Sequence, residues 1–433
     1  MPTKLMIAGA SVRAHVESAL RAGYCVHALD LFADRDTRLM IDNAADDSNS
    51  VATIGGFGEL LNLESEIRNC DAAIVCGGIE SRIELIRKLE SQIKLLGPSS
   101  SNLTKLQNPI SLSQSLEKAL GKHGVKIPLT SATPFADSDC RSWLSKSIGS
   151  SGGLGVESVE QPISENFDAG NDGRKYFQER VAGENISALF VSSRATQSNG
   201  GQNVSAATTK LIGVTQQLVG DAELGASEFQ YCGSIGPFDS KHSIGTLKNG
   251  LGEERIGQIE LVGEFIGREF DLIGVWGIDF IVNNAGVWPV DINPRLTASA
   301  ELYESSIASQ SRFKSVIDLH AKACVETDDP SNLDGFEEVA LIESKFYEAK
   351  AILFNRTSNH IGITDKLSDT LIGECDLGFF GSDRLGVTLA DIPCPGQTIK
   401  PGRPLLTVRV RCGSSEETLV RLREHAERIS RLL

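Results

Sequence analysis

Short apolar runs alternate with helix-like periodicity at the start of the chain. The apolar runs, which predict strands, lie at 4–10, 24–32, 71–78 and 94–99. Between them, residues 11–23 and 79–93 carry apolar side chains at the spacing of amphipathic helices. Strands that alternate with helices are typical of a parallel, doubly wound sheet. The pattern therefore predicts an α/β fold that begins with a Rossmann-like parallel-sheet domain over residues 1–100.

The first strand-to-helix turn, "GASVRA" at 9–14, lacks the G-x-G-x-x-G spacing that brings a backbone close to a pyrophosphate. It therefore does not predict NAD or FAD binding. Polar residues at the carboxyl ends of the predicted strands still face a common crevice, where open α/β sheets bind ligands. This crevice could hold a second substrate. Its candidate residues are Arg13, Asp30, Asp34, Arg35, Gly77, Gly78 and Glu80.

A glycine-rich segment, "WLSKSIGSSGGLGVESV" at 143–159, joins two predicted strands. Gly152, Gly153 and Gly155 allow backbone N–H groups to converge on an anion, and Ser150 and Ser151 add hydroxyl donors. Lys146, on the strand before the loop, supplies the positive charge that a phosphate cradle in an acidic protein needs. The segment is not a P-loop, because a strand follows the glycines. The alternative is a plain hairpin turn or a flexible linker.

Two further strands follow in "KYFQERVAGENISALFVSS" at 175–193. Gln178 and Glu179 end the first strand, and Glu184 begins the second. In this layout the backbone could bind an adenine edge while Glu184 reaches ribose hydroxyls. The alternative is that both glutamates flank a hairpin and are solvated.

The stretch "GVWGIDFIVNNAGVWPVDINPR" at 274–295 predicts a hairpin with one aspartate on each strand. With Gly286 left-handed in a three-residue loop, Asp279 falls opposite Asp291. Asn293 and Arg295 then share their face. Opposed like charges repel, and Mg²⁺ held by oxygen ligands removes the conflict. The alternative is a two-residue loop, which would flip the register and leave one aspartate in solvent.

The rest of the chain predicts a helix over 311–326, a strand-rich segment from about 350 to 411, and a closing helix over 415–433. We read these elements as a small β-rich cap. The predicted domains are therefore 1–100, a central domain with a glycine-rich lid over 101–315, and the cap over 316–433.

Composition narrows the function classes. The formal net charge of −15 argues against a nucleic-acid partner, because no broad basic face could attract a phosphate backbone. The nine cysteines form no C-x-x-C pair, which fits reduced thiols better than disulfides or a zinc site. Neither a secretory leader nor a long apolar span is evident, so we expect a cytoplasmic protein with no membrane partner.

The motifs in order resemble the ATP-grasp superfamily, in particular the predicted ATP-dependent carboligases related to biotin carboxylase. The resemblance rests on Lys146, "SSGGLGV", "FQERVAGE" and "GIDFIV...WPVDINPR". The start "IAGASVRAHVESALRAGYCVHALDLFADRDTR" and the tail "ADIPCPGQTIKPGRPLLTVRVR" extend it over nearly the whole chain. Both metal positions are aspartate here, whereas the family often uses glutamate.

The resemblance implies a role for each matching residue. Lys146 would bind the ATP phosphates, and Arg295 would steady the reacting phosphoryl group or acyl phosphate as the second catalytic residue. The metal, Mg²⁺ or Mn²⁺, would be held by Asp279, Asp291 and Asn293. The nucleotide contacts would come from Lys146, Ser151, Gly152, Gly153, Gly155, Gln178, Glu179, Val181 and Glu184, with Glu184 on the ribose.

The activity that the resemblance implies is ligation of a carboxylate to an amine, through an acyl phosphate made from ATP, with release of ADP and phosphate. Its setting would be small-molecule or cofactor biosynthesis, and a homo-oligomer stays open. One alternative is carboxylation through carboxyphosphate, although the chain lacks an "MKM"-type biotinyl lysine site. A non-catalytic ATP-binding protein is the other.

Overall fold

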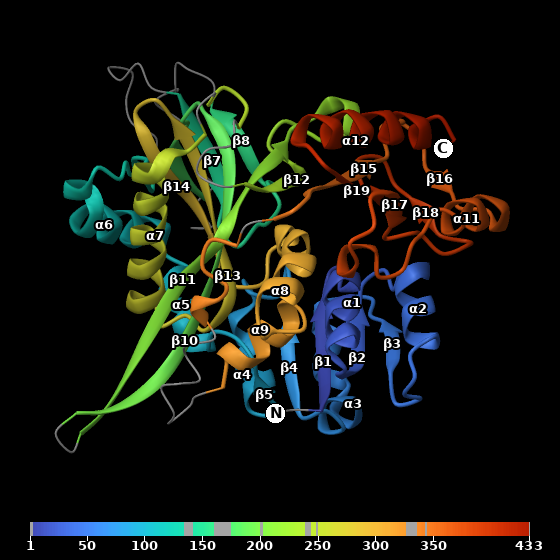
Figure 1. Cartoon of the computed structure of the whole chain (residues 1–433), viewed down its shortest axis with the longest axis horizontal. Helices are drawn as coiled ribbons and strands as arrows, with labels where there is room; N and C mark the ends of the chain where they lie inside the picture. Colours follow the sequence, from blue (N-terminus) through green and yellow to red (C-terminus); the bar gives the residue numbers. More distant parts are fainter. Residues whose placement is uncertain are drawn as a thin grey trace.

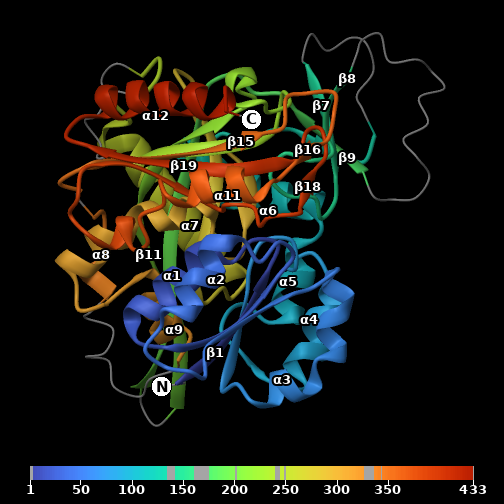
Figure 2. The same cartoon turned by 90° about the vertical axis from the view of Figure 1, so that its right-hand side faces the viewer.

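The computed structural model describes residues 3–133, 142–159, 175–199, 202–238, 244–247, 250–325, 336–342 and 344–432 of the 433-residue chain. Figure 1 shows the N-terminal domain, in blue, below the orange and red C-terminal segment, with the green and yellow strands beside both. Figure 2, turned by 90°, shows the same stacking of the C-terminal strands over the N-terminal domain.

The N-terminal sheet has five parallel strands in the order β3-β2-β1-β4-β5. They are β1 (Lys4–Gly9), β2 (Cys25–Asp30), β3 (Ser50–Thr53), β4 (Ala72–Val75) and β5 (Lys94–Leu95). Both faces are buried, because Leu5 and Ile7 pack with α1 whereas Met6 and Ala8 pack with α4. Burial on both faces is characteristic of parallel α/β sheets and confirms the predicted doubly wound fold.

Helices cover this sheet and lead out of it. They are α1 (Arg13–Ala22), α2 (Arg35–Asp42), α3 (Glu64–Arg68), α4 (Ile83–Glu90), α5 (Ser100–Leu106) and α6 (Pro109–Leu120), with the short 3-10 helices η1 (Phe57–Asn62) and η2 (Gly121–His123). Gly23 ends α1 in the left-handed conformation (φ 89°), which satisfies the last carbonyls of the helix.

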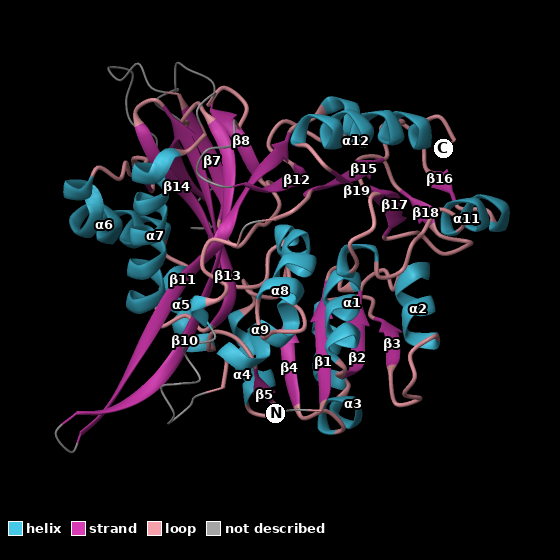
Figure 3. Ribbon diagram, in the orientation of Figure 1, coloured by secondary structure: helices cyan, strands magenta, loops and turns pink. Residues whose placement is uncertain are grey.

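A long sheet of eight strands forms the centre of the molecule (Figure 3), in the order β14-β13-β10-β11-β12-β15-β19-β17. Its strands are β10 (Glu184–Asn199), β11 (Gln202–Val219), β12 (Tyr231–Phe238), β13 (Gly274–Asn283), β14 (Gly286–Asn293), β15 (Tyr347–Phe354), β17 (Gly386–Ala390) and β19 (Pro404–Cys412). The helices α7 (Gly252–Glu269) and α12 (Ser415–Ser430) contribute apolar side chains to the same core as these strands.

The segment that we assigned to a cap thus supplies three strands, β15, β17 and β19, to the central sheet. The domain boundaries at 100 and 315 stay predictions. The remaining elements of this half are η3 (Ala222–Leu224), η4 (Ala298–Tyr303), α8 (Glu304–Gln310), α9 (Val316–Ala323), α11 (Asp365–Ile372), η5 (Phe379–Gly381) and the short pair β16 (Ile361–Gly362) and β18 (Thr398–Ile399).

A separate four-stranded sheet has the order β6-β9-β7-β8. Its strands are β6 (Thr130–Ser131), β7 (Trp143–Ser147), β8 (Val156–Val159) and β9 (Lys175–Glu179). The glycine-rich loop connects β7 to β8, and Lys146 pairs with Val156 across this hairpin. The small sheet therefore carries Lys146, the loop and Gln178 together.

Candidate active site

One large cavity, of about 1280 Å³, extends between the N-terminal sheet, the central sheet and the small sheet. Most of the residues that we predicted for a nucleotide and metal site line it: Lys146, Ser151, Gly152, Gly153, Gln178, Glu179, Val181, Asp279, Asp291, Asn293 and Arg295. Gly155 and Glu184 are not among its lining residues. Lys146 and Arg295 are 149 positions apart in sequence, yet both line this cavity. They meet there because the small sheet and the central sheet both border it.

The two aspartates stand opposite each other, but the turn differs from our prediction. The loop has two residues, Asn284 and Ala285, so that Asn283 pairs with Gly286. A two-residue loop alone would set Asp291 opposite Ile278. Instead a β-bulge shifts the register after the Phe280 pair, and Asp279 pairs with Asp291. The opposed aspartates are therefore confirmed, whereas the three-residue loop was wrong.

Asp279 is held by three hydrogen bonds at the base of this pair. Ser187 Oγ and Gln217 Nε2 each donate to Oδ1 at 3.0 Å, and Asn293 Nδ2 donates to Oδ2 at 3.1 Å. Burial nevertheless raises the pKa of Asp279, against the effect of these donors. The contact with Asn293 shows that the face shared by these residues is the one expected from the alternation of the strand.

Asp291 differs from Asp279 because its side chain is exposed to the cavity. Enclosure by the surrounding protein raises its pKa to about 6, with a smaller contribution from the charge of Asp279 and an opposing one from Lys146. Among the described residues, none donates a hydrogen bond to its carboxylate. The carboxylate of Asp291 faces the cavity and has no donor from these residues, so it is available to a ligand.

These oxygen donors fit a hard divalent cation. The described residues contain no group of three or more His, Cys, Asp or Glu arranged to hold a metal ion. Mg²⁺, however, commonly uses only one or two protein carboxylates and completes its octahedral shell with water and phosphate oxygens. Asp279 and Asp291, with the amide oxygen of Asn293, supply such a partial shell.

Lys146 lies at the same end of the cavity. Its Nζ donates to Gln178 Oε1 at 2.8 Å and to the Val290 carbonyl at 3.1 Å. Burial lowers the pKa of Lys146, and the nearby charges of Asp291 and Asp279 oppose that shift. The ammonium group therefore has one remaining N–H donor, and it lies near the carboxylates of Asp279 and Asp291.

The glycine loop is docked against the segment that precedes β12. Gly152 and Gly153 have φ of 64° and 78°, which favours glycine, and the Tyr231 N–H donates to the Gly152 carbonyl at 3.1 Å. Gly153 fits so closely that an added Cβ would lie 1.8 Å from the Phe229 carbonyl oxygen. Ser151, Gly152 and Gly153 line the cavity, so the loop closes over it.

Replacing Gly153 by alanine should weaken MgATP binding by roughly tenfold or more, because the Cβ adds strain of about 1–3 kcal/mol and forces the loop off Phe229. Isothermal titration calorimetry with MgATP would measure this change. Gly396 is a matched control, since its φ is also positive (82°) but nothing lies within 4 Å of an added Cβ. Unchanged affinity in Gly153→Ala would show that docking of the loop is not needed for binding.

The connection after β9 has the form expected of an adenine hinge. The Glu179 N–H donates to the Leu129 carbonyl at 2.8 Å, which fixes the strand, and the Arg180 N–H donates to the Ser142 carbonyl at 2.8 Å. Within the described part of the chain, the N–H of Val181 has no backbone acceptor. Because Val181 also lines the cavity, this N–H is available to a base edge.

Glu184 is not among the residues that line the cavity, whereas the next residue, Asn185, is. The carboxylate of Glu184 accepts hydrogen bonds from the Thr246 N–H (2.8 Å), Thr246 Oγ1 (2.7 Å) and Gln216 Nε2 (3.2 Å). Its contact with the ribose stays a prediction.

Arg295 reaches the N-terminal domain. Its Nε donates to Glu80 Oε1 at 2.5 Å, and its Nη2 donates to Asn293 Oδ1 at 3.1 Å. Arg13, Gly77 and Glu80 of the predicted crevice line the cavity. Asp34, Arg35 and Gly78 are not among the lining residues, and nor is Asp30, whose carboxylate accepts hydrogen bonds from the N–H groups of Val12, Phe32 and Ala33.

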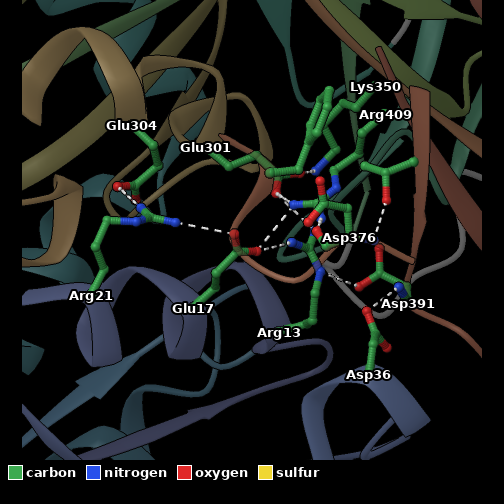
Figure 4. A network of polar contacts seen from close by, with 12 residues as sticks. Arg13, Glu17, Arg21, Asp36, Glu301, Glu304, Lys350, Asp376, Asp391 and Arg409 are labelled. Atoms are coloured by element: carbon green, nitrogen blue, oxygen red, sulfur yellow. Dashed lines mark hydrogen bonds and ion pairs between the residues drawn. The ribbon is translucent and has the colours of Figure 1, made fainter. Parts of the chain in front are cut away.

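A network of largely buried charges surrounds Arg13 (Figure 4). Arg13 donates to Glu17 (3.1 Å), Glu301 (2.8 Å) and Asp391 (3.0 Å), and Lys350 pairs with Glu301. Arg13, Lys350 and Asp391 also line the cavity, as does His15. Of this set, our sequence analysis singled out only Arg13, because Glu301 and Asp391 lie 288 and 378 residues away from it in sequence.

Comparison with known proteins identifies the central part of the chain. Residues 114–299 match the family model described as an ATP-grasp domain. No curated protein matches the chain. Among the described residues, no helix has the length and apolar character needed to cross a membrane.

Solved structures resemble the chain over nearly its whole length. N5-carboxyaminoimidazole ribonucleotide synthetase from Thermotoga maritima is 14% identical with a TM-score of 0.56, and the match covers 99% of this chain and 98% of that one. The Aspergillus clavatus enzyme complexed with ATP gives 14% identity, a TM-score of 0.59, and 100% and 99% coverage. Biotin carboxylase from Campylobacter jejuni gives 14% identity, a TM-score of 0.60, and 97% and 90% coverage. At this identity the likeness establishes the fold.

Proposed function

We propose, from the match of residues 114–299 to an ATP-grasp domain model, that the protein is an ATP- and Mg²⁺-dependent carboxylate–amine ligase that works through an acyl phosphate. One observation carries the proposal. A single cavity is lined by Lys146 and the glycine-rich loop, which suit phosphate binding, by the two opposed aspartates, and by Arg295. Phosphoryl transfer asks a protein mainly for positioning and for neutralisation of charge, and these residues supply both.

Lys146 and the loop residues Ser151, Gly152 and Gly153 would hold the ATP phosphates, with Gln178, Glu179 and Val181 along the adenine. Asp279, Asp291 and Asn293 would hold Mg²⁺. The bound ion would neutralise the phosphate oxygens that take up charge as the γ-phosphoryl group leaves. Glu184 stays the proposed ribose ligand, and Asn185, which lines the cavity beside it, is a second candidate.

The chemistry balances without a covalent enzyme intermediate. A carboxylate oxygen of the first substrate attacks the γ-phosphorus, which forms an acyl phosphate and ADP. The neutral amine then attacks the acyl carbon, the C–O bond to phosphate breaks, and the amine proton leaves with phosphate or solvent. Arg295 would neutralise the transferred phosphoryl group, and the crevice beside Arg13 and Glu80 would hold the second substrate.

ADP and phosphate release tests this proposal directly. The protein is incubated with ATP and Mg²⁺ against a matrix of carboxylates and amines, and we expect ADP only where both are present. Release of AMP and pyrophosphate in place of ADP and phosphate would contradict the acyl-phosphate route. Tight MgATP binding without turnover across the matrix would favour a non-catalytic ATP-binding protein.

Bicarbonate belongs in the same matrix as a second candidate for the carboxylate. Two of the structures that resemble this chain are named as an N5-carboxyaminoimidazole ribonucleotide synthetase and a biotin carboxylase, which favours a test of carboxyphosphate chemistry. ADP release that needs bicarbonate would assign the protein to carboxylation. The proposed setting is cytoplasmic small-molecule or cofactor biosynthesis, and the cysteines of the described part of the chain, all free, fit a reducing compartment.

A further inference from the structure

Glu80 and Arg295 form an ion pair between the N-terminal domain and the strand end that follows the metal pair. Both side chains are largely buried, at 13% exposure for Arg295 and 14% for Glu80. The other carboxylate oxygen of Glu80 accepts the Gly78 N–H at 2.7 Å. Both carboxylate oxygens of Glu80 therefore accept a hydrogen bond. The bond from the Gly78 N–H holds Glu80 to its own loop in the N-terminal domain, and the other oxygen binds Arg295.

The guanidinium group of Arg295 is fixed in turn by three acceptors on different atoms. Nε donates to Glu80, Nη1 donates to the Leu296 carbonyl at 3.1 Å, and Nη2 donates to Asn293 Oδ1 at 3.1 Å. A guanidinium group has five N–H donors. One N–H on each terminal nitrogen is thus left without an acceptor in the described structure, and these two donors, here called the free fork, are available to phosphoryl oxygens.

We infer that Glu80 is a positioning residue that locks the Nε side of Arg295, so that the free fork faces the phosphoryl group as it is transferred. This inference rests on the proposed function. Because Glu80 lies at the carboxyl end of β4, in the crevice proposed for the second substrate, the same contact joins that crevice to the phosphoryl site. Glu80 acts through Arg295 and needs no contact with ATP.

The test uses a mimic of the transferred phosphoryl group rather than an unknown substrate. Affinity is measured by titration calorimetry for MgADP alone and for MgADP with aluminium fluoride, which mimics the phosphoryl group in the transition state of transfer. For the wild type we expect aluminium fluoride to tighten MgADP binding by roughly tenfold or more, the value of one good charge-assisted contact. Glu80→Gln should bind MgADP within twofold of the wild type but lose that gain.

Three further variants make the result specific. Glu80→Asp keeps the negative charge on a shorter side chain and should lose part of the gain in affinity from aluminium fluoride. This second variant keeps the test valid if Glu80→Gln folds poorly. Glu84→Gln removes an exposed partner of Arg87 and should behave as the wild type. The double variant Glu80→Gln/Arg295→Lys should lose no more than Arg295→Lys alone, because the two residues act as one unit.

The outcomes separate the inference from the function on which it rests. If the wild type fails to bind MgADP, the nucleotide site itself is wrong. If it binds MgADP and Glu80→Gln keeps the full aluminium fluoride gain, or if the wild type shows no gain, the positioning role of Glu80 is wrong while nucleotide binding stands. Additive losses in the double variant would overturn action through Arg295.

Discussion

Asp291→Asn should reduce ADP formation by at least about a hundredfold, the usual scale for loss of one electrostatic contact to a reacting group. The amide keeps the shape of the side chain but removes the negative charge that faces the cavity. Steady-state assays with the substrates found in the matrix would measure kcat and KM. Asp42→Asn, on the exposed end of α2, is the matched control and should retain full activity.

The same variant should fold more stably than the wild type near neutral pH. Enclosure by the surrounding protein raises the pKa of Asp291 to about 6, so its ionised form is less favourable in the folded protein than in the unfolded chain. The stability of the wild type therefore falls as pH rises from the unfolded value near 4 toward 6. We expect Asp291→Asn to melt at a higher temperature above pH 6 and to match the wild type at pH 4. Loss of activity together with a lower melting temperature at pH 7 would point to misfolding instead.

Glu301→Gln should destabilise the protein by about 3–5 kcal/mol, because it removes one partner from a buried set of charges. Glu301 is 5% exposed and is shared by Arg13 and Lys350. Urea denaturation at pH 7 would measure the loss. Glu417→Gln, which removes an exposed partner of Arg421 on α12, should have little effect.

The pH dependence gives this prediction a second test. Burial alone would raise the pKa of Glu301, but Arg13, Lys350 and Arg409 together hold it well below its ordinary value. A carboxylate with a depressed folded pKa stabilises the protein above its unfolded pKa and loses that contribution as pH falls. The difference between Glu301→Gln and the wild type should therefore be full above about pH 5 and shrink below pH 4. A difference that does not change with pH would contradict the ionic role.

Four of the five strands of the N-terminal sheet were predictable from their apolar runs, two of which are followed by a clear helical pattern. The strand β3 (Ser50–Thr53) was missed because its four residues are too short and too polar to stand out. The opposition of Asp279 and Asp291 was predicted on one hairpin, but through a three-residue loop. The structure reaches the same pairing with a two-residue turn and a bulge at Val290. Turn residues alone do not fix whether a bulge follows, and that is the limit of local reasoning here.

The charge network shows a second limit. Arg13 and Glu301 are 288 residues apart, and no local pattern marks either as a partner of the other. The same holds for Arg295 and Glu80, which are 215 residues apart. Such contacts follow from how three segments pack, so they appear only when the whole chain is folded.

The bulge in β14 accommodates one extra residue, Val290, between Pro289, which pairs with Phe280, and Asp291, which pairs with Asp279. Without Val290 the two-residue turn alone would still set Asp291 opposite Asp279, so that pairing does not need the bulge. The Val290 carbonyl, however, accepts a hydrogen bond from Lys146. The extra residue therefore links the hairpin of the two aspartates to the small sheet that carries Lys146.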